Sequence, residues 1–300
     1  MNIAVTGATG FLGRYIVARL AGAGHRLRCW HRPSSDRSHF PGAVPEGAVT
    51  WIEGGLGDPG AVDRLLDGAD AVVHSALSRT GGFQAPPADL TGYLQLNLMG
   101  SLALMDAARR AGLSRFVFVS TCAVYDRILP DRPLDEAHPA WPASDYGAHK
   151  AAIEAFVHSF GFGHGFPACA LRPTGIYGLA HPAHASKWYG LVRSVARGEP
   201  VRVSKGGKEV HAADVARAVE ILLLAEEGRI LGESFNCYDR YVSEREVAEI
   251  ARRLTGSASD ITGPAPSPRN QIAVGKLAAL GMEYGGLTLL EGTIARMIEA

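Results

Sequence analysis

Residues 1–20 read MNIAVTGATGFLGRYIVARL and contain three glycines, Gly7, Gly10 and Gly13, at intervals of three. Apolar residues precede the glycines and a helical pattern follows them, which predicts a strand, a tight turn and a helix. Glycine has no Cβ and is used where the backbone turns sharply or approaches another group closely. Because the unpaired N–H groups at the start of a helix attract negative charge, we expect this turn to bind the pyrophosphate of a dinucleotide.

The first 172 residues alternate between longer helical patterns and short apolar runs such as NIAVT, RLRCW, DAVVHSA, RFVFVST and PACALRP. Such alternation implies parallel strands joined by crossover helices, so the sequence predicts an α/β fold with a Rossmann-type doubly wound parallel sheet. We expect residues 1–172 to form this dinucleotide-binding domain. Residues 173–300 should form mainly a smaller C-terminal substrate-binding region, of which about 208–238 pack back on the Rossmann domain. Residues 256–270 read as a loop.

The 300-residue chain carries 30 basic and 30 acidic residues and is 47% hydrophobic. Balanced charge provides no broad field for nucleic acid or an anionic membrane, so we expect a small-molecule partner. Met1 leads directly into the first strand, without a signal peptide or a stretch long enough to span a bilayer, which favours the cytoplasm. Cys29, Cys122, Cys169 and Cys237 lie far apart in or near apolar runs, which favours buried thiols and predicts no metal site.

Residues 6–13, TGATGFLG, resemble the opening of the extended short-chain dehydrogenase/reductase family, in its epimerase/dehydratase group. The resemblance covers most of the chain and implies an NAD(P)-dependent enzyme that moves a hydride between nicotinamide and a secondary alcohol or ketone of a small molecule. Similar motifs follow in order at DAVVHSA (70–76), at the helix carrying Asn97, and at VSTCAVY (119–125), YGAHK (146–150), LRPTGIYG (171–178) and HAADVARA (211–218).

The second predicted strand bears on the choice between NAD and NADP. NAD-using members of the family carry aspartate where this chain has His31, which is followed by Arg32. A guanidinium binds a phosphate through two parallel hydrogen bonds, so NADP is favoured; NAD is the alternative, because Asp36 could fold back onto the ribose. The resemblance implies cofactor contacts from Gly7, Thr9, Gly10, Phe11, Leu12, Gly13, His31, Arg32, Ser75, Ala76, Tyr146, Lys150 and Pro173.

Tyr146 and Lys150 stand four residues apart, so on a helix their side chains lie on one face. A nearby ammonium favours the phenolate and suits tyrosine to proton transfer. The resemblance therefore implies that Tyr146 is the catalytic acid and base and that Lys150 also holds the nicotinamide ribose. Thr121, or its neighbour Ser120, would bind the reacting oxygen at the carboxyl end of a strand.

Three further polar residues lie close to these motifs. The resemblance ties Asn97 to the catalytic lysine through backbone and water; alternatively, it is a helical residue with a local hydrogen bond. His74 lies between apolar strand residues, which indicates a structural core group. His149 should point to a different helix face from Tyr146 and Lys150, so it is assigned no chemistry.

The substrate is the least defined feature of the sequence. Many family members act on nucleotide sugars and carry asparagine where this chain has Gly175. The leading expectation is therefore an NADP-dependent oxidoreductase, and the alternative is a nucleotide-sugar epimerase or dehydratase that recycles its cofactor. A third hypothesis is a non-catalytic NAD(P)-binding sensor or scaffold. Lys187 and Trp188 are possible pocket residues, and the family implies a homodimer.

Overall fold

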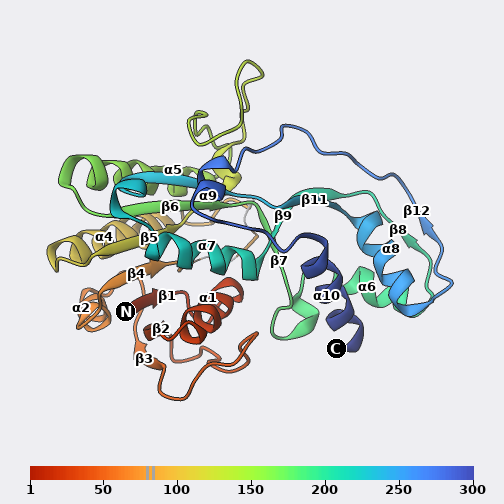
Figure 1. Cartoon of the computed structure of the whole chain (residues 1–300), viewed down its shortest axis with the longest axis horizontal. Helices are drawn as coiled ribbons and strands as arrows, with labels where there is room; N and C mark the ends of the chain where they lie inside the picture. Colours follow the sequence, from red (N-terminus) through yellow and green to blue (C-terminus); the bar gives the residue numbers. More distant parts are fainter. Residues whose placement is uncertain (79–80, 83–84) are drawn as a thin grey trace. The chain divides into compact units, whose positions relative to one another are not determined.

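The computed structural model describes residues 1–78, 81–82 and 85–300 (Figure 1). The chain forms two compact units, each built from segments that are separate in the sequence. Unit 1 comprises Met1–Pro173, Val215–Cys237 and Ile272–Met282, and unit 2 comprises Thr174–Asp214, Tyr238–Gln271 and Glu283–Ala300.

Unit 1 contains a seven-stranded sheet in the order β10-β6-β5-β4-β1-β2-β3, and every neighbouring pair is parallel. The predicted doubly wound parallel sheet is confirmed, and its carboxyl edge carries the candidate site. The strands are β1 (Asn2–Thr6), β2 (Arg26–His31), β3 (Val49–Glu53), β4 (Ala71–His74), β5 (Arg115–Val119), β6 (Ala168–Pro173) and β10 (Glu233–Cys237).

All the helical segments of unit 1 except α9, which follows β10, lie in the connections between these strands. Three of them, α2, α4 and α5, pack with the sheet around a continuous hydrophobic core. The segments are α1 (Phe11–Gly22), α2 (Pro59–Leu66), α3 (Leu90–Leu94), the π-helical η1 (Gln95–Met99), α4 (Gly100–Arg110), η2 (Cys122–Val124), α5 (Asp145–His158), η3 (Ser159–Gly163), α7 (Ala212–Leu224, shared with unit 2), η5 (Glu227–Arg229) and α9 (Gly275–Ala279).

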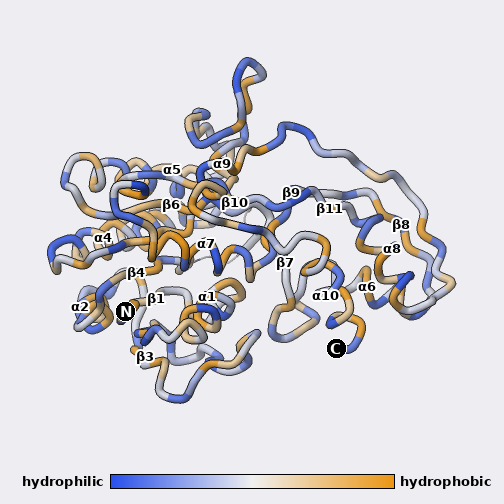
Figure 2. The backbone as a smooth tube through the Cα atoms, in the orientation of Figure 1, coloured by the Kyte–Doolittle hydropathy of each residue, from blue (hydrophilic) through white to orange (hydrophobic). Residues whose placement is uncertain are grey.

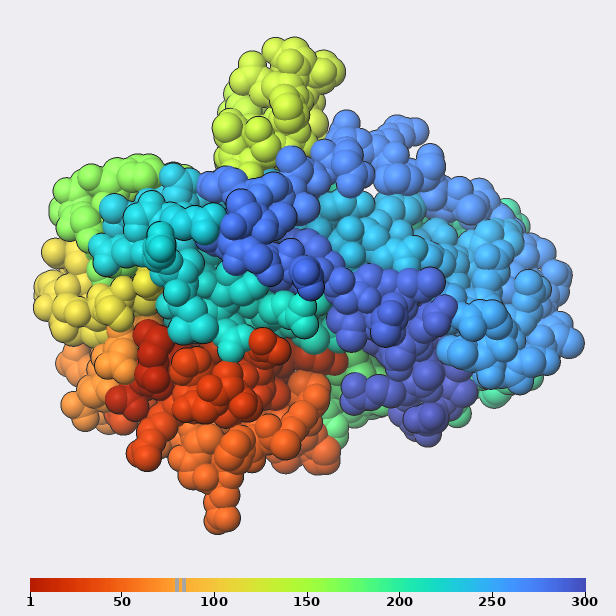
Figure 3. Space-filling view, in the orientation of Figure 1, coloured from red at the N-terminus to blue at the C-terminus, as the bar shows by residue number. Residues whose placement is uncertain are grey.

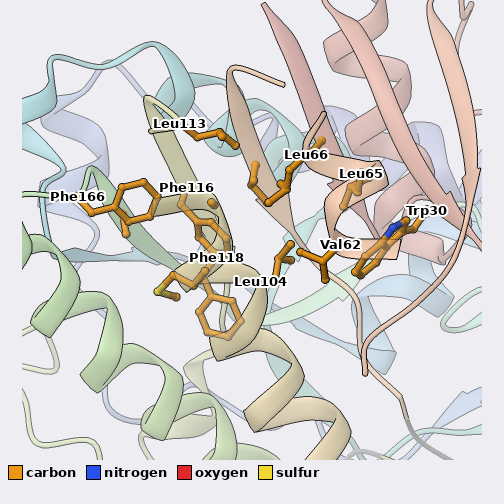
Figure 4. Packing of buried hydrophobic residues seen from close by; sticks show 14 of the residues in the cluster. Trp30, Val62, Leu65, Leu66, Leu104, Leu113, Phe116, Phe118 and Phe166 are labelled. Carbon is orange, nitrogen blue, oxygen red and sulfur yellow. The ribbon is translucent and has the colours of Figure 1, made fainter. Parts of the chain in front are cut away.

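Alternate residues of the central strands enter this core. Phe116 and Phe118 of β5 lie on the same side of the sheet, because side chains two apart in a strand share a face. Figure 4 shows them facing Leu104 of α4, with Val62 and Leu65 of α2 beyond. Packing of this kind contributes most of the stability of an α/β unit.

The opposite face of the sheet is also covered. Ile3 and Val5 of β1 are completely buried there. Helices α1 and α7 are joined by an ion pair of 2.6 Å between Arg19 Nε and Glu220 Oε2. Burial on both faces explains why these strands read as continuous apolar runs, and Figure 2 shows hydrophobic colours among the central strands.

A long segment, residues 126–143, separates η2 from α5. The N–H of Arg127 donates to the carbonyl of Trp141 at 3.2 Å, which closes the segment into a loop. In Figure 3 the segment stands out from unit 1 in yellow-green. The loop returns the chain to the carboxyl edge of the sheet, where α5 begins.

Unit 2 has its own core, in which α6, α8 and α10 pack against one another. Ser243 caps α8 by accepting the N–H of Glu246 at 3.1 Å, as its capping-box spacing predicts. The predicted loop 256–270 contains a short strand, β12, so that expectation was wrong there. The elements are β7 (Gly175–Tyr177), η4 (Ala183–Ala185), α6 (Tyr189–Ala196), β8 (Val201–Arg202), β9 (Gly206–His211), β11 (Arg240–Ser243), α8 (Glu244–Thr255), β12 (Ile261–Thr262) and α10 (Gly286–Glu299).

Two expectations from composition can be compared with the described residues. Cys29, Cys169 and Cys237 are buried, Cys122 is half-buried, and all four are free thiols. No helix within the described ranges combines the length and the apolar character that crossing a membrane requires.

Candidate active site

The turn between β1 and α1 has the geometry that its glycines predict. Gly7 adopts a φ of 73°, a conformation that L side chains rarely adopt. A Cβ on Gly13 would lie 1.9 Å from the carbonyl oxygen of Gly7, so only glycine lets helix and turn approach this closely. Gly10 is the N-cap of α1 and provides no side-chain cap, and the first turn contains no acidic residue. The helix start therefore suits an anionic pyrophosphate.

The end of β4 lies directly beside this turn. Thr6 Oγ1 accepts the N–H groups of Ser75 and Ala76, each at 3.2 Å. A Cβ on Gly7 would lie 2.8 Å from the nitrogen of Ala76. The structure thus brings the predicted cofactor residues Ser75 and Ala76 together with the glycine turn.

His74 is a structural residue, as expected. Its two ring nitrogens lie 2.6 Å from Thr6 Oγ1 and 2.7 Å from Ser101 Oγ. Burial, and then the charge of Lys150, lowers the pKa of His74 to about 3. The ring is therefore neutral near pH 7 and links β1, β4 and α4.

The region after β2 contains the residues that bear on NADP. Arg32 is exposed, and its N–H donates to Ser35 Oγ at 3.1 Å. The carboxylate of Asp36 accepts from Ser38 and pairs with Arg14 at 3.0 Å. The Ser38 hydrogen bonds, and then Arg14, hold the pKa of Asp36 well below its usual range. Asp36 is thus already engaged by groups of the chain.

Helix α5 carries the predicted Tyr146 and Lys150 on one face. The helix begins close to η2. A Cβ on Gly147 would lie 2.4 Å from the carbonyl oxygen of Ala123, so only glycine allows this approach. Gly147 was missed by the sequence analysis, although a glycine in the first turn of a helix is a usable signal of close contact. Tyr146 is half-buried, while Lys150 is buried.

Lys150 reaches the carboxyl end of β5. Its Nζ donates to the carbonyl of Val119 at 2.8 Å and lies 4.5 Å from the ring centre of Phe118. Burial lowers the pKa of Lys150 to about 7, and the nearby Glu154 opposes this shift. Thr121 follows the same strand end, is 8% exposed and accepts the N–H of Ala123 at 3.1 Å. Thr121 and Lys150 therefore occupy the same edge of the sheet.

Asn97 lies in the π-helical segment η1, a type of irregularity frequent at functional sites. Its Oδ1 accepts the N–H of Ser78 at 2.7 Å. Its Nδ2 donates to the carbonyls of Ser78 and Tyr93, at 2.8 and 3.0 Å. All three partners are backbone groups, and the carbonyl of Tyr93 belongs to the same helical run as Asn97. The water-mediated link between Asn97 and Lys150 stays a prediction.

The expectation that His149 points away from the tyrosine was wrong. The ring centres of Tyr146 and His149 lie 5.6 Å apart. Side chains three or four residues apart are neighbours on a helix surface. Tyr146 can therefore contact His149, three residues later, as well as share a face with Lys150, four residues later.

A buried ion pair behind the site was also missed. Glu154 Oε2 of α5 accepts from Arg172 Nε at 2.8 Å and Nη2 at 2.5 Å, and both side chains are at most 4% exposed. Arg172 also donates to the hydroxyl of Tyr125, and Ser120 donates to Glu154. The sequence signal for this ion pair was Arg172, a charged residue in the apolar run PACALRP. Ser120, the alternative to Thr121, is thus engaged in this network.

Unit 2 also contains a buried carboxylate that makes an ion pair. Glu209 of β9 is 3% exposed and pairs with Lys187 at 2.5 Å. A Cβ on Gly175 or Gly207 would lie 2.6 or 2.5 Å from its oxygens, so the two glycines make room for it. Burial raises the pKa of Glu209, and Lys187 opposes this shift. Lys187 and Trp188 lie together, with Nζ 5.0 Å from the ring centre.

The fold and the unit 1 site define a class of protein. A parallel sheet with a glycine turn at its first helix, and a tyrosine and lysine on the helix after β5, form the framework of a dinucleotide-dependent oxidoreductase. The model of the NAD dependent epimerase/dehydratase family matches residues 3–237. The chain therefore belongs to this family of NAD-dependent enzymes, within the extended short-chain dehydrogenases/reductases.

Individual relatives agree with this membership. The chain is 31% identical to a UDP-glucose 4-epimerase of Streptomyces lividans, over 84% of this chain and 80% of the relative. It is 28% identical to a dTDP-glucose 4,6-dehydratase of Streptomyces niveus, over 89% and 81%. The Thermus thermophilus UDP-glucose 4-epimerase, solved in complex with NAD, shares the fold, with a TM-score of 0.78 and 24% identity over the full length of both chains. Relatives of this kind do not support the sensor or scaffold hypothesis.

Proposed function

We propose that the protein is a nucleotide-sugar epimerase or dehydratase that recycles the hydride held on its cofactor. The observation that carries the proposal is the position of Lys150, which donates a hydrogen bond to the carbonyl of Val119 and shares a helix face with Tyr146. The relatives of the chain include a 4-epimerase and a 4,6-dehydratase. The relatives favour this function over the net oxidoreductase that was the leading expectation.

The residues of unit 1 supply proton transfer and orientation. Tyr146 would take the proton of a substrate hydroxyl and return it in the reverse direction. Thr121 would donate a hydrogen bond to the same oxygen and stabilise developing negative charge. Lys150 favours the phenolate while it is protonated, so its support weakens as the pH rises through its pKa of about 7.

The cofactor would be held by the residues around the glycine turn and the strand ends. NAD(P), when bound, provides the acceptor and donor of the hydride. The carboxylate of Asp36 pairs with Arg14 and accepts from Ser38, so it would not bind the hydroxyls of the adenosine ribose. Arg32 would instead bind the 2′-phosphate and select NADP over NAD. The proposed contacts are Gly7, Thr9, Gly10, Phe11, Leu12, Gly13, His31, Arg32, Ser75, Ala76, Tyr146, Lys150 and Pro173.

The proposal assigns cofactor binding and substrate binding to different parts of the chain. Residues 1–172 would bind the dinucleotide, and residues 173–300 would mainly bind the substrate, with about 208–238 packing back on the Rossmann domain. Of this stretch, Val215–Cys237 lie in unit 1. A homodimer built on the Asn97 and Tyr146 helices is proposed with it. Light scattering tests the dimer, and a monomeric mass would contradict it.

Retention of the cofactor tests the recycling. An enzyme that returns its hydride to the same substrate can keep its dinucleotide through many turnovers, whereas a net reductase must exchange it. Purified protein should be denatured and the released nucleotide identified by mass spectrometry. We expect about one NAD(P) per chain. An empty protein that turns over only with added NADPH would support the net oxidoreductase instead.

A further inference from the structure

We infer that His149, fixed by Tyr93, is a positioning residue that holds the ring of Tyr146 in its working orientation. His149 follows Tyr146 by three residues on α5, and the two ring planes meet at 60°. A tyrosine near the start of a helix can otherwise exchange between rotamers. The inference rests on the proposed role of Tyr146 in proton transfer.

His149 is itself held from a second helix. The hydroxyl of Tyr93, in α3, lies 3.0 Å from His149 Nδ1. The two rings meet edge to face, with centres 5.2 Å apart and an interplanar angle of 88°. His149 is 2% exposed, so it has little freedom to move away from either tyrosine.

Tyr93 is tied in turn to the loop after β4. Its carbonyl accepts from Nδ2 of Asn97, and the same amide group binds both the N–H and the carbonyl of Ser78. A continuous array therefore runs from Ser78 through Asn97, Tyr93 and His149 to Tyr146. This gives Asn97 a connection to the tyrosine that does not pass through Lys150.

The imidazole acts in this array without charge. Burial, and then the neighbouring charge of Lys150, lowers the pKa of His149 to about 3. A neutral ring adds no positive charge next to Tyr146. His149 therefore contributes packing and hydrogen bonding, with its Nδ1 also 3.3 Å from the carbonyl oxygen of Asp145, and Tyr146 keeps the proton-transfer role.

Misplacement of a reacting group by about 1 Å can slow catalysis by about 100-fold. The variant Tyr93→Phe removes only the hydroxyl, and His149→Ala removes the ring that contacts Tyr146. We expect each to lower kcat by about 10-fold or more while KM and the affinity for NAD(P) change by less than about 2-fold. Because both residues act through one array, the double variant should be no slower than His149→Ala.

A second readout needs no substrate. In the protein loaded with oxidised NAD(P), the pH titration of tyrosinate absorbance should be recorded for each variant, and the signal of Tyr146 isolated by difference from Tyr146→Phe. Release of the ring from its position near Lys150 should raise the titration midpoint by about one pH unit. Tyr93→Phe keeps the test valid if His149→Ala fails to fold.

His158 supplies a matched control. It lies on the same helix and its Nδ1 is 2.6 Å from the carbonyl oxygen of Gly232, away from Tyr146. His158→Ala should leave the midpoint and kcat unchanged. Wild-type values for both Tyr93→Phe and His149→Ala, or an equal shift in His158→Ala, would overturn the positioning role. If wild type and Tyr146→Phe titrate identically, the proposed role of Tyr146 fails, and this inference with it.

Discussion

Replacing Arg172 by methionine should destabilise unit 1 strongly. The guanidinium makes two hydrogen bonds to Glu154, and both side chains are almost fully buried. The substitution keeps much of the aliphatic volume but leaves the carboxylate of Glu154 buried without its counter-charge. Loss of one partner from a buried ion pair costs about 3–5 kcal/mol.

That loss should be visible in thermal melting followed by circular dichroism. For a protein of this size, about 1 kcal/mol corresponds to roughly 2 °C in Tm, so a fall of about 6–10 °C is expected. The double variant Arg172→Met/Glu154→Leu removes both partners and should recover part of the loss, because no unpaired carboxylate remains. A fall of less than about 2 °C in Arg172→Met, or a double variant less stable than both single variants, would refute the reasoning.

Three further changes test other parts of the account. In Gly13→Ala the added Cβ collides with the Gly7 carbonyl, so dinucleotide affinity in fluorescence titration should fall by about 100-fold, and near-normal affinity would contradict the close approach. Arg32→Ala should weaken NADPH binding by about 10-fold or more in calorimetry while sparing NADH; equal losses would show that Arg32 does not read the 2′-phosphate. Because the folded pKa of His74, about 3, lies below its unfolded value of 6.5, the unfolded state binds more protons between them, so stability is lost as the pH falls through this window. Between about pH 7 and pH 5 this loss is about 2 kcal/mol, and urea unfolding of His74→Asn should show a correspondingly shallower decline, while an unchanged slope would contradict it.

The sheet of unit 1 could be predicted because its strands are buried on both faces. A strand such as β6 then appears as an unbroken apolar run, and the helix patterns between the runs reveal the crossovers. The short strands of unit 2 offer no such signal. β9 reads GGKEVH, and its polar side chains are explained by the pairing of Glu209 with Lys187, a tertiary contact that local pattern does not contain.

In the candidate site, too, some residues could be predicted from the sequence and others could not. The positions of Gly7, Tyr146 and Lys150 follow from motifs in which backbone geometry or helical spacing is required by the chemistry. The contact of His149 with Tyr93 joins residues 56 apart and depends on how two helices pack, which spacing alone cannot reveal.

Turnover of a nucleotide sugar tests the central claim most directly. Wild-type protein should be incubated with UDP-glucose or dTDP-glucose, without added reductant, and the products followed by NMR. The account predicts a 4-epimer or a 4,6-dehydrated product, with a rate lowered at least 100-fold, roughly, in Tyr146→Phe. No conversion of either sugar by the dinucleotide-loaded wild type, or an unchanged rate in Tyr146→Phe, would contradict it.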